Sequence, residues 1–335
     1  LVIAQIALAL IMLVSAGLIV RSFAGLRQVD LGFEPAGVST GAIVLGGAGY
    51  TTPEQVQAFL TQLEQRLPGI PGAVSAGFSS QLPLNTAGDS DTAFTLVGKP
   101  ALLDSGRPRV SWYRSINATY FATMGMRFAR GRAMAPGAPE AVVNEAFVRR
   151  FFPSEDPMGQ QIVVGNRAPL TIVGVVADAR TRGPRTDTRN EMFLPYQFLP
   201  QGGYNIVVRG AGNVAVIPAL RSLITSIDAR VPLARPTTMA ELHADALAQP
   251  RLLATLLGAF AAAALLLALI GIYGVIAYAV SHRTTEMGIR LALGATPKQV
   301  VGLVLGDGLK LGALGLAIGI AGGLLAANGL STLLY

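Results

Sequence analysis

The sequence predicts a helical membrane protein with a large α+β domain outside the membrane. The 335 residues are 51% hydrophobic and only 13% charged, whereas soluble domains carry about 25% charged residues. The apolar residues gather near the two ends of the chain, at 1–20, 252–280 and roughly 300–325. The more polar stretch between them, about 30–250, is long enough for one large or two small folded domains.

The first apolar segment, 1–26, is expected to cross the membrane. It lacks a basic region at its start and continues into Arg21-Ser22-Phe23 without a convincing cleavage site, which argues against a signal peptide. The sequence begins inside this apolar helix and stops on apolar residues at 329–335. We therefore expect a fragment of a longer protein, with the first helix truncated at its start and 329–335 as the start of a truncated loop.

The second apolar segment, 251–281, is the strongest candidate for a spanning helix. Residues 252–281 contain no Lys, Arg, Asp, Glu or His, and about 20 such residues suffice to cross the hydrocarbon core. At 1.5 Å per residue the apolar run 252–280 is about 43 Å long, against a core of roughly 30 Å. Its outer end is expected to emerge as a stalk, and Tyr273 and Tyr278 mark its cytoplasmic end.

A short polar loop joins the second segment to a third spanning helix, 296–328. Between 282 and 298 the loop holds Arg283, Arg290 and Lys298 against Glu286 alone, so the positive-inside rule places it in the cytoplasm. The domain at 27–250 is then extracytoplasmic. These features predict a multi-pass protein of the cell (inner) membrane.

Local rules predict a short helix at 282–295 in this loop. Gly294 suits the position after a helix, and Thr296 with Gln299 forms a capping box for the next helix, which has Pro297 in its first turn.

Spacing of about 100° per residue places Arg283, Glu286 and Arg290 on one face of this short helix, with Ile289 and Leu293 beside them. The segment is either a solvated interfacial turn or a docking helix for a soluble partner.

The third segment carries small residues at helical spacing, which allow close helix contacts in lipid. Two interpretations stay open: ordinary packing within one bundle, or a dimer seam shared with a second copy. The glycines expected to pack are Gly315, Gly319 and Gly323.

Inside the domain, two β-α-β units flank a central insert. This pattern predicts a split lobe, about 37–80 and 203–245, with a second lobe inserted at about 81–202. The split lobe is expected to contain strands at 38–45, 73–79, 204–209 and 233–237, with helices at 53–67 and 214–229. The inserted lobe is expected to contain strands at 92–97, 109–116, 161–164, 170–176 and 192–195, with one helix at 144–152 capped by Asn144.

The composition excludes several classes of function. Of the net charge of +7, residues 30–250 contribute little, with 19 Lys and Arg against 17 Asp and Glu, so no basic groove for nucleic acid is expected. The chain has no cysteine and two histidines far apart in the sequence, His243 and His282, which argues against a metal centre or a hydrolase. Its glycine-rich segments lack the spacing of a phosphate-binding loop. No catalytic, metal or cofactor-binding residue is expected.

The run RTTEMGIRLALGA at 283–295 closely resembles the signature of the FtsX-like/MacB-like permeases of ABC transporters. Other segments resemble the same family, and the mid-domain ones look most like its acidobacterial-type orphan permeases. These segments are LGF at 31–33, LPG at 67–69, PGAV at 71–74, YFATMG at 120–125, RGR at 130–132, VVNEAF at 142–147, DPMG at 156–159, IVGVVAD at 172–178 and GIYGV at 271–275.

The resemblance implies a membrane subunit with four spanning helices, of which this chain carries three, and a two-lobed domain between the first two. The segment at 282–295 would be a coupling helix that engages a separate ATPase. ATPase closure would then move the outer domain through the long helices, an action called mechanotransmission. The residues assigned to this coupling helix are Arg283, Glu286, Met287, Gly288, Ile289, Arg290, Leu293 and Gly294.

The implied function is that of an ABC-type efflux or mechanotransmission permease without enzymatic activity of its own. The implied partners are an ABC ATPase subunit, a second permease copy or half, and the lipid bilayer. Whether a periplasmic adaptor is a further partner stays open. One alternative is a non-transporting regulator that signals ATPase motion to an external enzyme or binding protein. Another is a membrane-anchored receptor or adhesin.

Overall fold

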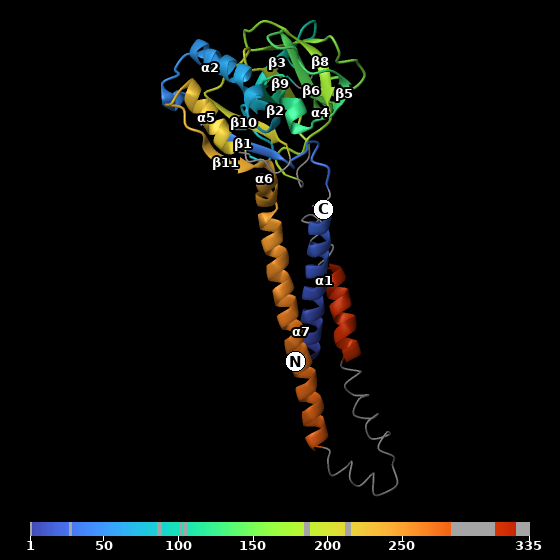
Figure 1. Ribbon diagram of the computed structural model, residues 1–335. Coiled ribbons are helices and arrows are strands. Elements are labelled where there is room, and N and C mark those ends of the chain that lie inside the picture. The colour runs from blue at the N-terminus through green and yellow to red at the C-terminus, as the bar shows by residue number, and fades with distance from the viewer. Residues whose placement is uncertain are drawn as a thin grey trace. The chain divides into compact units, whose positions relative to one another are not determined.

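The computed structural model describes residues 2–26, 29–85, 89–100, 102, 106–183, 188–211, 216–282 and 312–325. The chain forms two compact units (Figure 1). One is a domain, Asp30–Leu247, and the other is a helical unit made of Leu1–Val29 and Ala248–Tyr335.

The domain contains two lobes, and the first is a four-stranded sheet covered by helices. Its strands are β1 (Val38–Val44), β2 (Ala73–Ser79), β10 (Gly203–Gly210) and β11 (Ala234–Thr238), in the order β11-β1-β10-β2. Each neighbouring pair is antiparallel. With helix α2 after β1 and helix α5 after β10, this is the ferredoxin-like, split β-α-β arrangement. We call it the helix-covered lobe, and its four predicted strands are confirmed to within one residue at each end.

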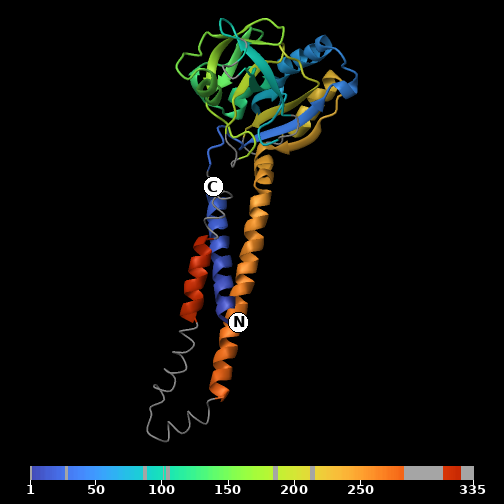
Figure 2. The same ribbon diagram turned by 180° about the vertical axis from the view of Figure 1, so that it is seen from behind.

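Helices α2 (Pro53–Arg66) and α5 (Ile217–Ile227) cover one face of this sheet (Figure 2). The predicted helix at 53–67 is confirmed, and Thr52 with Gln55 forms a capping box at its start. The helix α5 is shorter than the predicted 214–229. Apolar residues of both helices, among them Phe59 and Leu220, pack with Ile43 and Phe78 of the sheet. Short 3-10 turns lie at Gly46–Ala48 (η1) and Leu67–Gly69 (η2).

The second lobe is a closed ring of six strands, which we call the barrel lobe. In ring order the strands are β4 (Arg109–Ile116), β3 (Asp91–Leu96), β7 (Gln161–Val164), β8 (Leu170–Val176), β6 (Glu140–Asn144) and β9 (Glu191–Pro195). The ring closes because β9 pairs in parallel with β4, from Trp112↔Glu191 to Ile116↔Pro195. Closure leaves no unpaired sheet edge in the ring. The predicted strands β3, β4, β7, β8 and β9 are confirmed to within one residue.

The helix predicted at 144–152 is confirmed as α4 (Glu145–Phe151). The side-chain oxygen of Asn144 caps it by accepting a hydrogen bond from the backbone N–H of Phe147 at 3.0 Å. One face of α4 packs into the ring, where Phe147 and Phe151 contact Phe94 at ring-centroid distances of 5.1 and 5.0 Å.

The two lobes join where the insert leaves and re-enters the helix-covered lobe. Ser79, at the end of β2, is the registered partner of Asn205, near the start of β10. Ser79 also pairs with Ile116 of β4, which continues the hydrogen bonding from one lobe to the other.

Four elements of the domain are absent from the sequence-based expectations. They are β5 (Phe128–Gly131), β6, α3 (Tyr120–Met124) and α6 (Met239–Ala246). The strand β5 pairs with β8 outside the ring. The helix α6 does carry a sequence signal, since Thr238 and Glu241 form a capping box at its start.

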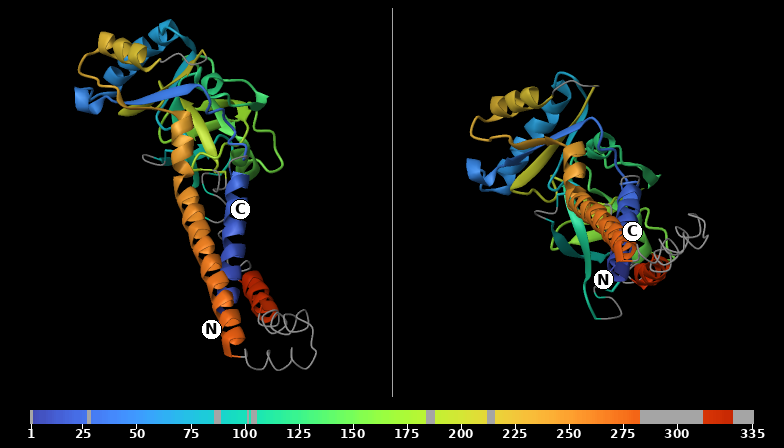
Figure 3. Two further views of the ribbon diagram at one scale, coloured as in Figure 1. Left: turned by 60° about the horizontal axis from the view of Figure 1, so that its bottom comes forward. Right: turned by 90° about the horizontal axis from the view of Figure 1, so that it is seen from below.

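The helical unit contains α1 (Val2–Leu26), α7 (Ala248–His282) and a helix at Gly312–Leu325 (Figure 3). The helix α7 has 35 residues and is uninterrupted. Within the described residues, Arg251–His282 is the one helix long and apolar enough to cross a membrane, and its most apolar 18-residue stretch has a mean hydropathy of 2.5. The apolar stretches Ile3–Leu18 and Gly312–Leu325 are shorter.

Candidate functional site

The residues predicted to form the coupling helix lie outside the described residues. These are Arg283, Glu286, Met287, Gly288, Ile289, Arg290, Leu293 and Gly294. The described part of α7 ends at His282, whose ring lies 4.3 Å from that of Tyr278 between centroids. Tyr273 and Tyr278 are both exposed within this structure.

The helices α1 and α7 pack through small residues. On α7, Ala254, Ala261 and Ala268 are buried and recur every seven residues, so they share one face of the helix. On α1, Ala9 and Ala16 are buried at the same spacing. Large apolar residues of α7, such as Phe260 and Ile270, are exposed. The seven-residue spacing of these alanines is visible in the sequence.

The helix Gly312–Leu325 packs on α1 through glycines. A Cβ atom added at Gly315 would lie 2.9 Å from the Cβ of Ile6. One added at Gly319 would lie 2.9 Å from the Cβ of Leu10 and 3.1 Å from the Cα of Ala7, and one at Gly323 would lie 3.4 Å from Val14. At Gly315 and Gly319 these distances are shorter than real Cβ contacts, so the two helices approach as closely as glycine allows.

The helical unit therefore consists of apolar helices with α1 in contact with both of its described neighbours. Close backbone approach maximises van der Waals contact, which is the main source of helix association in lipid. Such an arrangement can hold the helices in register.

In the domain, a charged pair is buried in the barrel lobe. The guanidinium of Arg114 on β4 lies 3.2 Å from the carboxylate of Glu191 on β9, and their side chains are 3% and 6% exposed. Arg114 also donates to the carbonyl of Gln81 at 2.8 Å, and Thr181 donates to Glu191 at 3.1 Å. Burial lowers the pKa of Arg114, but its interactions with Glu191, Tyr120 and Asp89 together outweigh burial and raise the pKa. The pair joins the two parallel strands that close the ring.

The phenol of Tyr120 is buried beside this pair, and burial raises its pKa to about 12. Glu191 is also held through its backbone, because its N–H donates to the side-chain oxygen of Asn144 at 2.8 Å. These hydrogen bonds satisfy several polar atoms of Arg114 and Glu191, which indicates that the pair has a structural role in the domain.

In the acidic turn at 89–91, Asp89 forms ion pairs with two arginines. Asp89 lies 3.5 Å from Arg182 and 3.4 Å from Arg189, and the guanidinium of Arg189 stacks over the ring of Trp112 at 3.9 Å. Among the described residues, no group of three or more His, Cys, Asp or Glu side chains could hold a metal ion.

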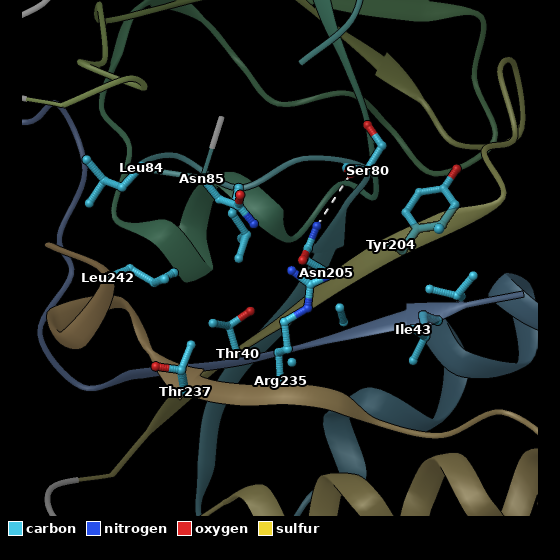
Figure 4. Close-up of a pocket in the computed structure, with 15 residues that line it drawn as sticks. Thr40, Ile43, Ser80, Leu84, Asn85, Tyr204, Asn205, Arg235, Thr237 and Leu242 are labelled. Carbon is cyan, nitrogen blue, oxygen red and sulfur yellow. Dashed lines mark hydrogen bonds between the residues drawn. The ribbon is translucent and has the colours of Figure 1, made fainter. Parts of the chain in front are cut away.

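The domain has a pocket of about 480 Å³ on its helix-covered lobe (Figure 4). The strands β1, β10 and β11, the segment after β2 and the start of α6 line it. The lining side chains are Thr40, Ala42, Val44, Ser80, Leu82, Leu84, Asn85, Asn205, Arg235, Thr237 and Leu242, and Gly41, Ile43, Gly203 and Tyr204 complete the wall. The sequence did not predict this pocket, because strands far apart in the chain form it.

Together, the fold and the helical unit define a class of protein: a helical membrane protein with a two-lobed α+β domain between its first and later apolar helices. Comparison with known families agrees. The MacB-like periplasmic core domain matches residues 1–227, and the FtsX-like permease C-terminal domain matches residues 258–334. The chain belongs to the MacB/FtsX-like family of ABC transporter permeases.

Curated relatives carry export names. The macrolide export ATP-binding/permease protein MacB of Azoarcus sp. (strain BH72) is 31% identical over 199 residues, covering 56% of this chain and 30% of that protein. The protein of the same name from Burkholderia cenocepacia (strain HI2424) is 27% identical over 288 residues, covering 75% of this chain and 42% of that protein. The chain thus spans well under half the length of these relatives.

Among solved structures, the chain is similar to the periplasmic region of MacB from Actinobacillus actinomycetemcomitans. The TM-score is 0.41 at 15% sequence identity, covering 63% of this chain and 92% of that one.

Proposed function

We propose that this chain is the permease part of an ABC-type export or mechanotransmission system, in which ATP hydrolysis by a partner moves the extracytoplasmic domain. The observation that carries the proposal is the course of the chain from domain to coupling segment. Only Leu247 separates α6 of the domain from α7, and α7 then continues without a break to His282, next to the segment at 283–295.

An uninterrupted helix is a stiff element. At 1.5 Å per residue, the 35 residues of α7 extend about 52 Å, whereas the hydrocarbon core is about 30 Å thick. A helix that passes through the membrane would therefore have several turns to spare outside the core. Motion of its cytoplasmic end could then be passed along the helix to the domain.

The membrane arrangement follows from the same reasoning. We infer three spans in this chain, formed by α1, α7 and the segment that contains Gly312–Leu325. The domain would lie on the extracytoplasmic side of the cell membrane and the segment 282–295 on the cytoplasmic side. The exposed large side chains of α7 support contact with lipid. A second permease copy or half and an ABC ATPase subunit would complete the working unit.

Charge reversal in the coupling segment tests this proposal. In the full-length protein, Glu286→Lys is expected to abolish capture of the ATPase. The substitution replaces the negative charge between Arg283 and Arg290 with a positive one. Capture is measured by affinity purification from membranes, with the amount of inserted protein as the reference. Glu155→Lys, an exposed change in the domain, is the matched control and should leave capture intact. Equal capture by both variants would contradict the proposal.

A regulator that moves no substrate would use the same coupling. Transport into inverted vesicles separates the two, since ATP-driven accumulation of a compound requires a transport path. ATPase coupling without accumulation of macrolides or pyoverdine, the compounds in the names of the relatives, would favour the regulator.

A further inference from the structure

The pocket of about 480 Å³ lies on the face of the sheet opposite α2 and α5. Side chains alternate between the two faces of a strand. Ile43, Ile206 and Val208 pack with the helices α2 and α5, so Thr40, Ala42 and Asn205 face the other way, into the pocket. The volume falls within the range of about 300–1,000 Å³ that is usual for small-molecule sites.

A β-bulge directs a positive charge into this pocket. In the pairing of β1 with β11, Thr40 faces Thr237 and Ala42 faces Ala234, so Gly41 faces both Arg235 and Pro236. Bulges of this kind redirect a side chain. Figure 4 shows the side chain of Arg235 extending from β11 into the pocket.

The bulge is strained. Arg235 has a φ of 45°, in the left-handed region that favours glycine, although it precedes a proline, which further restricts its backbone. Leu84, across the pocket, has a φ of 66°. Among the described residues these two are the only non-glycine residues with a positive φ, and both line the pocket. Strained residues gather at binding sites, where the surrounding structure holds them in place.

Arg235 is the one charged side chain among the lining residues of the described structure. The neighbouring polar side chains already donate elsewhere: Thr40 to the carbonyl of Ile206 at 2.8 Å, Thr237 to Glu241 at 2.6 Å and Asn205 to the carbonyl of Ser80 at 3.4 Å. No ion pair or hydrogen bond involves the guanidinium of Arg235 within the described residues, and the residue is exposed. The apolar side chains of Leu82, Leu84 and Leu242 form a wall of the pocket.

We propose that this pocket binds a small amphipathic carboxylate. The guanidinium of Arg235 takes the carboxylate through two parallel hydrogen bonds, a geometry that arginine offers and lysine does not. The apolar body of the ligand lies against Leu82, Leu84 and Leu242. The site goes beyond the proposed coupling function and stands independently of it, because it involves no residue of the segment 283–295.

The probe is N-acetyl-4-benzoyl-L-phenylalanine, a carboxylate whose benzophenone crosslinks to nearby C–H groups under ultraviolet light. Its carboxamide is the matched neutral probe. The full chain in nanodiscs is irradiated with each probe, empty nanodiscs serve as the blank, and crosslinked peptides are located by mass spectrometry. The carboxylate is expected to label β1, the segment 80–85 or α6, with a yield about tenfold above that of the carboxamide.

Two variants and one control complete the test. Arg235→Gly should lower labelling by the carboxylate about tenfold to the carboxamide level, and it should fold, because glycine accepts the positive φ. Arg235→Lys should retain part of the labelling. Arg221→Ala removes an exposed arginine from α5, on the opposite side of the sheet, and should change nothing. Labelling that is equal for both probes, unaffected by Arg235→Gly, or located outside the pocket would overturn the proposal.

Discussion

The domain and the helical unit bury opposite kinds of side chain. In the domain the largest fully buried side chains are aromatic, among them Tyr120, Phe59 and Phe193. In the helical unit the buried residues are alanines such as Ala261, which is 2% exposed, while Tyr273 and Ile270 are 74% and 66% exposed.

This difference reflects two solvents. In water, transfer of large apolar groups to the interior drives folding, so the largest side chains are buried. In lipid the surroundings are as apolar as the interior, and close backbone approach through small residues decides the packing. The inverted burial in α1 and α7 indicates helices whose outer surface meets lipid, in agreement with the family assignment.

The largest expected effect tests the interior of the domain. Glu191→Ala leaves the charge of Arg114 buried without a partner, which should lower the free energy of unfolding by about 3–5 kcal/mol. Urea unfolding of the full chain, followed by the fluorescence of Trp112, measures the change. Trp112 is the single tryptophan of the chain and lies on β4 next to the pair.

An exposed ion pair on the same lobe is the control. Arg130 and Asp156 are 52% and 58% exposed, so Arg130→Ala should lower the free energy of unfolding by less than about 1 kcal/mol. Equal shifts for Glu191→Ala and Arg130→Ala would mean that water reaches the Arg114–Glu191 pair in the folded domain, although both side chains are buried.

The second prediction concerns the helical unit, where enlarging a small buried residue is expected to destabilise the packing. Gly319→Ala adds a single methyl group, yet its Cβ would lie 3.1 Å from the Cα of Ala7, so α1 must move. We expect a loss of about 1–3 kcal/mol from overpacking, measured by titration of the reconstituted protein with SDS and circular dichroism.

Gly258→Ala on α7 is the matched change, because no described atom lies within 4 Å of its Cβ position. It should be neutral or stabilise the helix by up to about 1 kcal/mol, as alanine does in helix interiors. If Gly319→Ala behaves in the same way, the glycine contact with α1 does not hold these helices together.

The smallest effect concerns the water-exposed ends of the domain helices. Thr52→Ala removes the side chain that accepts from the N–H of Gln55 at 3.4 Å, and should cost about 1 kcal/mol. Faster hydrogen exchange in the first turns of α2, read by mass spectrometry, reports this loss. Thr52→Ser keeps the acceptor and should restore protection, whereas equal exchange in both variants would show that the cap contributes nothing.

The sequence predicted most elements of the domain because their signals are local. The strands expected at 38–45, 73–79 and 109–116 match β1, β2 and β4, and the helix expected at 53–67 matches α2, which Thr52 caps. The strand β6 was missed because it is buried on both faces and shows no alternation, and β5 because it is largely exposed and ends in a glycine. The helix α3 was missed because five residues are too few to show a helical period, and α6 although its capping box is visible in the sequence.

The pairing of strands that are far apart in the chain could not be predicted from the sequence. The contact of β9 with β4 closes the barrel lobe, but Glu191 and Trp112 show no mutual pattern that a single sequence reveals. The same limit applies to the pocket. Arg235 lies within the strand predicted at 233–237 and precedes a proline, so its positive φ contradicts local expectation and follows from the bulge opposite Gly41.

Ser79 and Asn205 face each other on neighbouring strands although 125 residues of chain lie between them. The barrel lobe thus occupies the place of an ordinary hairpin turn between β2 and β10. Its two connections leave the sheet side by side, so an insert of any length can begin and end there without shifting the register of the strands. The barrel lobe could therefore be exchanged or enlarged while the four-stranded sheet keeps its strand register and its connection through α6 to α7.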